Sequence, residues 1–151
     1  MREFNSADEL KEAVGEDLGH SDWLQIEQGR INLFADATDD HQWIHVDVEK
    51  AKDGPFGAPI AHGYLTLSLV NHFLPDLFGV PSAKMGINYG CNKVRFPSPV
   101  PVGSKIRASG QITEVDDVAG GVQVVVRVTV EVEGAPKPAC IADTVSRFIF
   151  E

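Results

Sequence analysis

The chain has 151 residues, of which 43% are hydrophobic, so it can form one globular domain, 1–151, with a core of its own. Its net charge of −9 at pH 7 excludes general binding to nucleic acid, because the phosphate backbone repels an acidic surface. The start of the chain lacks the layout of a signal peptide, and no unbroken apolar span has the length to cross a membrane. The chain also has only two cysteines, so the sequence predicts a cytoplasmic protein with free thiols.

The first forty residues are expected to hold two helices and a short strand. A capping box at 6–9 starts the first helix, and Gly15 ends it. Residues 22–27 alternate weakly and predict a short strand. Apolar residues at helical spacing over 28–38 predict the second helix, which leads into a segment rich in aspartate and histidine.

Asp40 and His45 are the two groups of that segment that can work together as an acid–base pair. They are five residues apart, so on a continuous α-helix they would be turned about 140° from each other. Their side chains can converge only if 40–45 is a turn or a loop. The sequence therefore predicts such a loop, followed by a helical turn over 46–51.

Residues 60–74 are expected to form the central helix of the fold, because they are apolar on nearly every side. A helix with this pattern should be surrounded by protein. A rigid loop with two prolines, 55–59, precedes it, and Pro75 and Gly79 are expected to close it.

The chain after residue 80 is expected to be sheet. Four runs alternate as strands do, and they are separated by a proline-rich connection and two turns. The strands are expected at 85–96, 105–115, 122–133 and 139–150, the connection at 97–103, and the turns at 116–121 and 134–136. Helices followed by consecutive strands predict an α+β fold, with an antiparallel β-sheet wrapped around the long central helix.

Three kinds of site can be weighed on the residues alone. His41 and His45 have the spacing of two zinc ligands, but Gln42 stands where that motif needs glutamate, so no metal is expected. Ser68 lies inside the apolar helix, without the sharp elbow of a nucleophilic serine. General acid–base chemistry remains, in which the Asp40 carboxylate and the His45 imidazole activate one water molecule.

Residues 34–51 resemble the hydratase motif of the MaoC-like, (R)-specific enoyl-CoA hydratase family. Six positions of the motif match, namely Phe34, Thr38, Asp40, Ile44, His45 and Ala51. Asp39, Gln42 and Trp43 depart from the motif and stand where the family usually has glycine, asparagine and proline. The resemblance continues through three further stretches, 59–63, 88–90 and 93–97.

This resemblance implies a single MaoC-like hot-dog domain that works as a homodimer, with active sites near the interface. The reaction would be reversible addition of water to a trans-2-enoyl-CoA, giving an (R)-3-hydroxyacyl-CoA, with coenzyme A as part of the substrate and no other cofactor. Asp40 and His45 would bind and activate the water. Gly63 would donate its backbone N–H to the thioester oxygen, as an N–H group in the first turn of a helix is free to do.

Five further residues are expected to contact the substrate. Gln42 keeps an amide that can hold the water, on a longer side chain than the family's asparagine. His62 either lines the pocket or is a core imidazole bonded to a backbone carbonyl. Asn71 lies two helical turns beyond the predicted oxyanion donor and is expected to border the same cavity. Lys93 and Arg95 share one strand face in a stretch without acidic residues, and are expected to bind the phosphates of coenzyme A.

Two alternatives stay open at the level of sequence. A hot-dog acyl-CoA thioesterase would direct the water to the thioester carbonyl instead. A non-catalytic subunit would bind acyl-CoA or an acyl-carrier protein without turnover. Asp40 with His45 on one loop favours hydration, and the presence of Gly63 as well favours an active enzyme.

Overall fold

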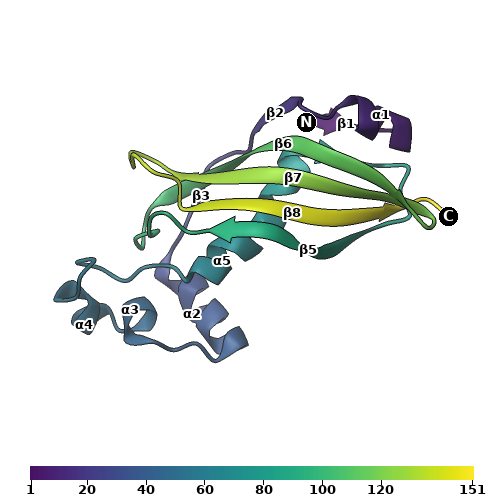
Figure 1. Ribbon diagram of the computed structural model, residues 1–151. Helices are drawn as coiled ribbons and strands as arrows, with labels where there is room; N and C mark the ends of the chain where they lie inside the picture. The colour runs from purple at the N-terminus through teal and green to yellow at the C-terminus, as the bar shows by residue number, and fades with distance from the viewer.

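An antiparallel sheet wrapped around a helix forms the body of the protein (Figure 1). The computed structural model describes all residues from Met1 to Glu151. The strands of this sheet are β2 (Asp17–His20), β3 (Leu24–Gln25), β5 (Met85–Arg95), β6 (Lys105–Val118), β7 (Gly121–Val132) and β8 (Cys140–Ile149). They lie in the order β2-β6-β7-β8-β5, with β3 also on β6, and all pair antiparallel. Two separate short strands, β1 (Arg2–Glu3) and β4 (Phe78–Gly79), pair in parallel.

The helices fall into groups that lie on different sides of the sheet. They are α1 (Ala7–Glu12), α2 (Gln28–Thr38), α3 (Trp43–Val46), α4 (Val48–Lys52), α5 (Gly63–Ser68) and α6 (Val70–Leu77). The central pair, α5 and α6, packs against the sheet, whereas α2, α3 and α4 gather beyond one end of it (Figure 1). The α+β fold with a sheet around a central helix is therefore confirmed.

Two local predictions of helix structure are confirmed in detail. The Ser6 hydroxyl accepts the backbone N–H of Glu9 at 3.2 Å and so caps α1. The second helix, α2, has the predicted bounds. It ends at Asp39, which adopts the left-handed conformation with φ of 60°. That conformation explains why glycine is usual at this position of the family motif, and aspartate is among the side chains that tolerate it.

The central helix differs from the prediction at both ends and in the middle. It begins at Gly63 rather than at Ile60, because Ile60 forms a β-bridge with Pro101 and the backbone of His62 is still non-helical, with ψ of 138°. The N–H groups of Ile60 and Ala61 bond to the carbonyls of Ile44 and Val100. It is divided at residue 69 into α5 and α6. It also runs past Pro75, which was expected to close it, and the buried Leu77 then ends it.

One face of the central helix is exposed, which corrects the expectation that protein surrounds it. Leu65 and Phe73 are buried toward the sheet, whereas Tyr64, Ser68 and Asn71 face solvent. The neighbouring edge strand β5 is exposed along nearly its whole length. An exposed helix face beside an unpaired strand edge leaves this side of the chain open.

Two strand predictions also need correction. The first short strand covers only Leu24–Gln25 within the predicted 22–27. The predicted turn at 116–121 is mostly strand, because β6 continues to Val118 and pairs with Gly121. The connection is therefore a two-residue hairpin turn with Gly120 at φ of 79°, a value that favours glycine.

The hydrophobic core lies between the sheet and the central helix. The inward side chains of β6 and β7, such as Ile106, Val126 and Val128, meet Phe73 and Leu77 of α6 there. These contacts fix the central helix, and with it the segment that begins at Gly63. No helix of the structure combines the length and apolarity needed to cross a bilayer.

Candidate active site

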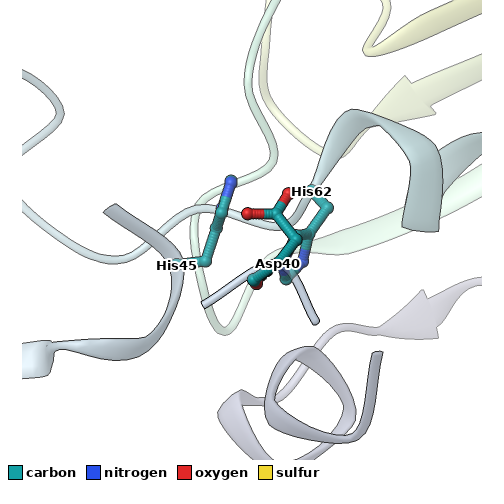
Figure 2. A group of neighbouring side chains, drawn as sticks. All are labelled: Asp40, His45 and His62. Atoms are coloured by element: carbon teal, nitrogen blue, oxygen red, sulfur yellow. Dashed lines mark hydrogen bonds between the residues drawn. The ribbon is translucent and has the colours of Figure 1, made fainter. Parts of the chain in front are cut away.

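Asp40 and His45 converge as predicted, although only part of their segment is a loop. Asp40 follows the end of α2, and His45 lies on the single helical turn of α3. Figure 2 shows both side chains beside His62. A carboxylate oxygen of Asp40 and one ring nitrogen of each histidine all lie within 4.8 Å of one another.

The His45 ring is held as a neutral base. It is buried, with 7% of its surface exposed, and its Nδ1 lies 2.7 Å from the carbonyl oxygen of Ile60. A carbonyl can only accept, so Nδ1 carries the hydrogen and Nε2 keeps its lone pair. Burial is the largest influence and lowers the pKa of His45 below its usual 6.5. The hydrogen bond to the Ile60 carbonyl and the charge of Asp40 raise this pKa, and His62 lowers it. His45 is therefore uncharged at pH 7 and able to accept a proton at Nε2.

The Asp40 carboxylate is exposed and free to bind a water molecule. It accepts a long hydrogen bond of 3.4 Å from the backbone N–H of Gln42, whose side chain is exposed. Two hydrogen bonds of about 2.8 Å that meet at a tetrahedral oxygen span about 4.6 Å. The Asp40 and His45 atoms lie within 4.8 Å of each other and share no direct hydrogen bond, so the pair is within reach of one bridging water.

Gly63 lines a cavity together with His45. It is the first residue of α5, and its N–H makes no backbone hydrogen bond within the chain. The cavity has a volume of about 360 Å³, and Phe56, Thr66 and Phe96 also line it. A residue that can accept a proton and a residue with an unpaired N–H therefore border one space.

Phe96 accounts for the glycine at position 63. A Cβ atom added to Gly63 would lie 3.1 Å from the Phe96 ring, which is closer than ordinary van der Waals contact. Phe96, Phe56 and Thr66 were not predicted as cavity residues. No local pattern marks them, because two loops and the helix α5 bring them together.

Asn71 does not line the cavity of His45 and Gly63. It borders a second cavity of about 260 Å³ between the central helix and β5, with Leu67, Leu74 and Tyr89 among its neighbours. Eight residues of helix separate Asn71 from Gly63 by about 12 Å. Sharing a helix face therefore did not place both residues at one cavity, and contact of Asn71 with the substrate stays a prediction.

Lys93 and Arg95 lie together and line a depression separate from the cavity of His45 and Gly63. With Arg127 and Asp143 they border a volume of about 400 Å³ on the strands β5, β7 and β8. Asp143 pairs with Arg127 at 2.8 Å, and this ion pair lowers the pKa of Asp143. Lys93, which stands opposite Asp143 in the sheet, lowers it further, so the carboxylate partly offsets the charge of Lys93 but does not pair with Arg95. Phosphate binding by Lys93 and Arg95 stays a prediction.

His62 is a buried imidazole bonded to a backbone carbonyl, as one of the two sequence interpretations had it. Its Nε2 lies 2.9 Å from the carbonyl oxygen of Asp40, and its ring stacks on His45 with centroids 3.9 Å apart. Nothing in the sequence spacing signals this contact, because Asp40 and His62 are 22 positions apart.

The cluster of Asp40, His45 and His62 contains three atoms of the type that bind metals. The two rings, however, are stacked with planes only 23° apart, so their lone pairs run nearly parallel instead of converging on one ion. His41, the histidine of the zinc-like spacing, instead pairs with Asp36 at 2.9 Å on the surface. That no metal takes part stays a prediction.

Comparisons with known proteins agree with this geometry. Residues 9–134 match the family described as the MaoC-like domain. The chain is 53% identical over 150 residues to 3-hydroxyacyl-thioester dehydratase Z of Mycobacterium tuberculosis, covering 99% of each chain.

Solved structures show the same fold. A monoamine oxidase regulatory protein from Archaeoglobus fulgidus superposes with a TM-score of 0.79 at 27% identity, over 98% of this chain and 95% of the other. The R-hydratase PhaJ1 from Pseudomonas aeruginosa superposes with a TM-score of 0.70 at 23% identity, over 91% and 83%. The predicted hot-dog fold is confirmed. The chain therefore belongs to the MaoC-like dehydratase family and is an enzyme of the hydratase–dehydratase type.

Proposed function

We propose that the protein is an (R)-specific enoyl-CoA hydratase, which adds water reversibly to a trans-2-enoyl-CoA. One observation carries the proposal: a neutral His45 and the Asp40 carboxylate lie within 4.8 Å of each other, within reach of one shared water molecule. Gly63, whose N–H is unpaired, lines the same cavity as His45. Base, water site and oxyanion donor are the parts that hydration of a conjugated thioester needs.

The geometry supports a simple sequence of bond changes. The thioester oxygen accepts the Gly63 N–H, and the water between Asp40 and His45 attacks C3 of the enoyl group. His45 Nε2 takes the proton from the water, while the C2=C3 electron pair moves toward the thioester oxygen. C2 then receives a proton returned from the Asp40 and His45 pair, which gives the 3-hydroxyacyl thioester. The exposed amide of Gln42, next to Asp40, is proposed to orient the water.

A second copy of the chain is proposed to cover the open side of the sheet. The edge strand β5 has no partner beyond it, and Met85, Ile87 and Tyr89 expose apolar surface along it. Such an edge pairs readily with another chain. Light scattering should give the mass of two chains, and the 16.4 kDa of one chain would contradict the homodimer.

The two cysteine thiols, Cys91 and Cys140, favour a reaction that uses no cysteine nucleophile. Cys91 and Cys140 are both free, and burial raises the pKa of Cys140 to about 11 and also that of Cys91. Neither is a thiolate near pH 7. Free thiols are typical of a reducing compartment, and we propose the cytoplasm as the location of the enzyme.

Lys93 and Arg95 are proposed to bind the phosphates of coenzyme A. Replacing both by glutamine is expected to raise KM for an enoyl-CoA about tenfold and to leave kcat unchanged, because the lost contacts lie far from the reacting atoms. The matched substrate is an enoyl thioester of N-acetylcysteamine, which has no phosphates and should keep its KM. Lys105→Gln, on β6, is the control variant. An equal rise in KM for both substrates would contradict phosphate binding.

The reaction itself is tested by following the enoyl absorbance of a trans-2-enoyl-CoA while free thiol is measured in parallel. Loss of absorbance without thiol release, unchanged by a metal chelator, is the expected result. Thiol release without hydration would establish the alternative, an acyl-CoA thioesterase. Binding of acyl-CoA or an acyl-carrier protein without turnover would identify a non-catalytic subunit instead.

A further inference from the structure

We propose that His62 is a positioning residue that fixes the Asp40 loop and the His45 ring in one relative arrangement. The inference rests on the proposed hydration, because it assigns His62 to the site that performs that reaction. Its basis is that the buried His62 contacts both the Asp40 loop and the His45 ring through its side chain. Through its backbone it also begins α5, the helix that carries Gly63.

The first contact holds the loop of Asp40. The Asp40 carbonyl can only accept, so His62 Nε2 carries the hydrogen and donates it across 2.9 Å. Asp40 itself is exposed, and its side chain accepts only the long hydrogen bond from the Gln42 N–H. The bond from His62 therefore ties an otherwise loosely held residue to the start of α5.

The second contact sets the plane of the His45 ring. The two imidazoles stack at 3.9 Å with planes 23° apart, and Phe34 packs on His62 with centroids at 4.9 Å. His45 is also pinned through Nδ1 to the Ile60 carbonyl. One hydrogen bond and one stacked face together leave the ring a single orientation, with Nε2 directed away from Ile60.

The third contact is covalent. His62 is the N-cap residue of α5, and its carbonyl accepts the N–H groups of Leu65 and Thr66. The next residue is Gly63, so any displacement of His62 also moves the proposed oxyanion donor. The Asp40 loop, the His45 ring and the Gly63 N–H are thereby fixed by one residue, His62, which has 3% of its surface exposed.

Packing alone does not account for an imidazole at this place. Nδ1 of His62 is buried without a hydrogen-bond partner, and such an unsatisfied acceptor costs desolvation free energy. A phenyl ring would fill a similar space without that cost. A phenyl ring, however, cannot donate a hydrogen bond to the Asp40 carbonyl.

Two substitutions separate the roles of His62. His62→Phe keeps a ring against His45 and loses the bond to Asp40. We expect kcat to fall about 10- to 100-fold, with KM little changed, because a small misplacement of a catalytic group has effects of this size. His62→Gln can keep the donor and loses the stacked ring. We expect a smaller fall in kcat, together with a shift in the pH dependence.

The pH dependence of kcat/KM distinguishes a positioning role of His62 from a structural one. Replacing a residue with only a structural role would not shift the acidic limb of this profile. The titratable groups that act on His45 are His62 and Asp40, and burial of the ring is the largest influence on its pKa. The base must be neutral, so wild-type activity should persist below pH 6.5 and fall only at the lowered pKa of His45. In His62→Gln the ring becomes better hydrated, its pKa rises, and the acidic limb moves to higher pH. In His62→Phe the limb should stay close to that of the wild type.

The full chain is used throughout, and circular dichroism confirms that each variant is folded. His20→Gln, on the distant strand β2, is the matched control and should behave as the wild type. Wild-type kcat and an unmoved acidic limb in both His62 variants, with Asp40→Asn inactive, would overturn the assignment. Full activity of Asp40→Asn would instead overturn the hydration mechanism itself, and the role of His62 with it.

Discussion

Asp40→Asn is expected to lower kcat for hydration about 10²- to 10⁴-fold, which is the usual contribution of one acid–base group. The asparagine has nearly the same shape and keeps the hydrogen bond from His62 to the backbone carbonyl, so the fold should not change. What is lost is the carboxylate that holds the water opposite His45. Absorbance at saturating enoyl-CoA measures the effect directly.

The neighbouring carboxylate provides the control for this experiment. Asp39→Asn removes the same charge one residue earlier, and asparagine accepts the left-handed conformation that Asp39 adopts. This variant should keep wild-type activity. His45→Ala should be as inactive as Asp40→Asn, because its Nε2 is the proposed proton acceptor. Near-normal rates in either catalytic variant would refute the mechanism.

Gly63→Ala is expected to lower kcat about 10²- to 10³-fold, the size of effect seen when one oxyanion donor is lost. The alanine keeps its N–H, but its Cβ occupies the space in which the thioester must approach. It would also lie 3.1 Å from the Phe96 ring, which would have to move by a few tenths of an ångström. Single-turnover rates separate this effect on chemistry from an effect on binding.

The crowding by Phe96 can be separated from the obstruction of the thioester by the new Cβ. Adding Phe96→Leu to Gly63→Ala relieves the contact with the ring but leaves the Cβ in the path of the thioester. We expect no recovery of kcat in the double variant. Gly29→Ala, where a Cβ meets nothing within 4 Å, is the control glycine. Full recovery by Phe96→Leu would show that Gly63 serves packing and not the oxyanion.

Patterns with a short repeat were predicted well from the sequence. The bounds of α2 were correct, and the alternation of valines gave β7. The acid–base pair was also accessible, because Asp40 and His45 are five residues apart and only a turn between them allows contact. These features depend on neighbours in the chain, so the residues themselves contain the information.

Features that depend on distant partners were missed. The central helix starts only at Gly63 because Ile60 is held in a β-bridge with the distant Pro101 and the backbone of His62 is not yet helical. Asn71 was placed at the wrong cavity, because helical periodicity gives direction around the axis but does not show which strand lies opposite. Neither partner strand nor acceptor can be read from the residues at the position itself.

The sequence by itself thus determined the type of fold and the convergence of Asp40 and His45, and it predicted Gly63 as a donor, since each follows from local periodicity or from a short motif. Only the tertiary structure decided that His45 is a neutral base bonded through Nδ1, and that His62 joins it to the Asp40 loop. The reason is physical. Burial, ring stacking and hydrogen bonds to carbonyls 15 and 22 residues away arise only when the chain has folded.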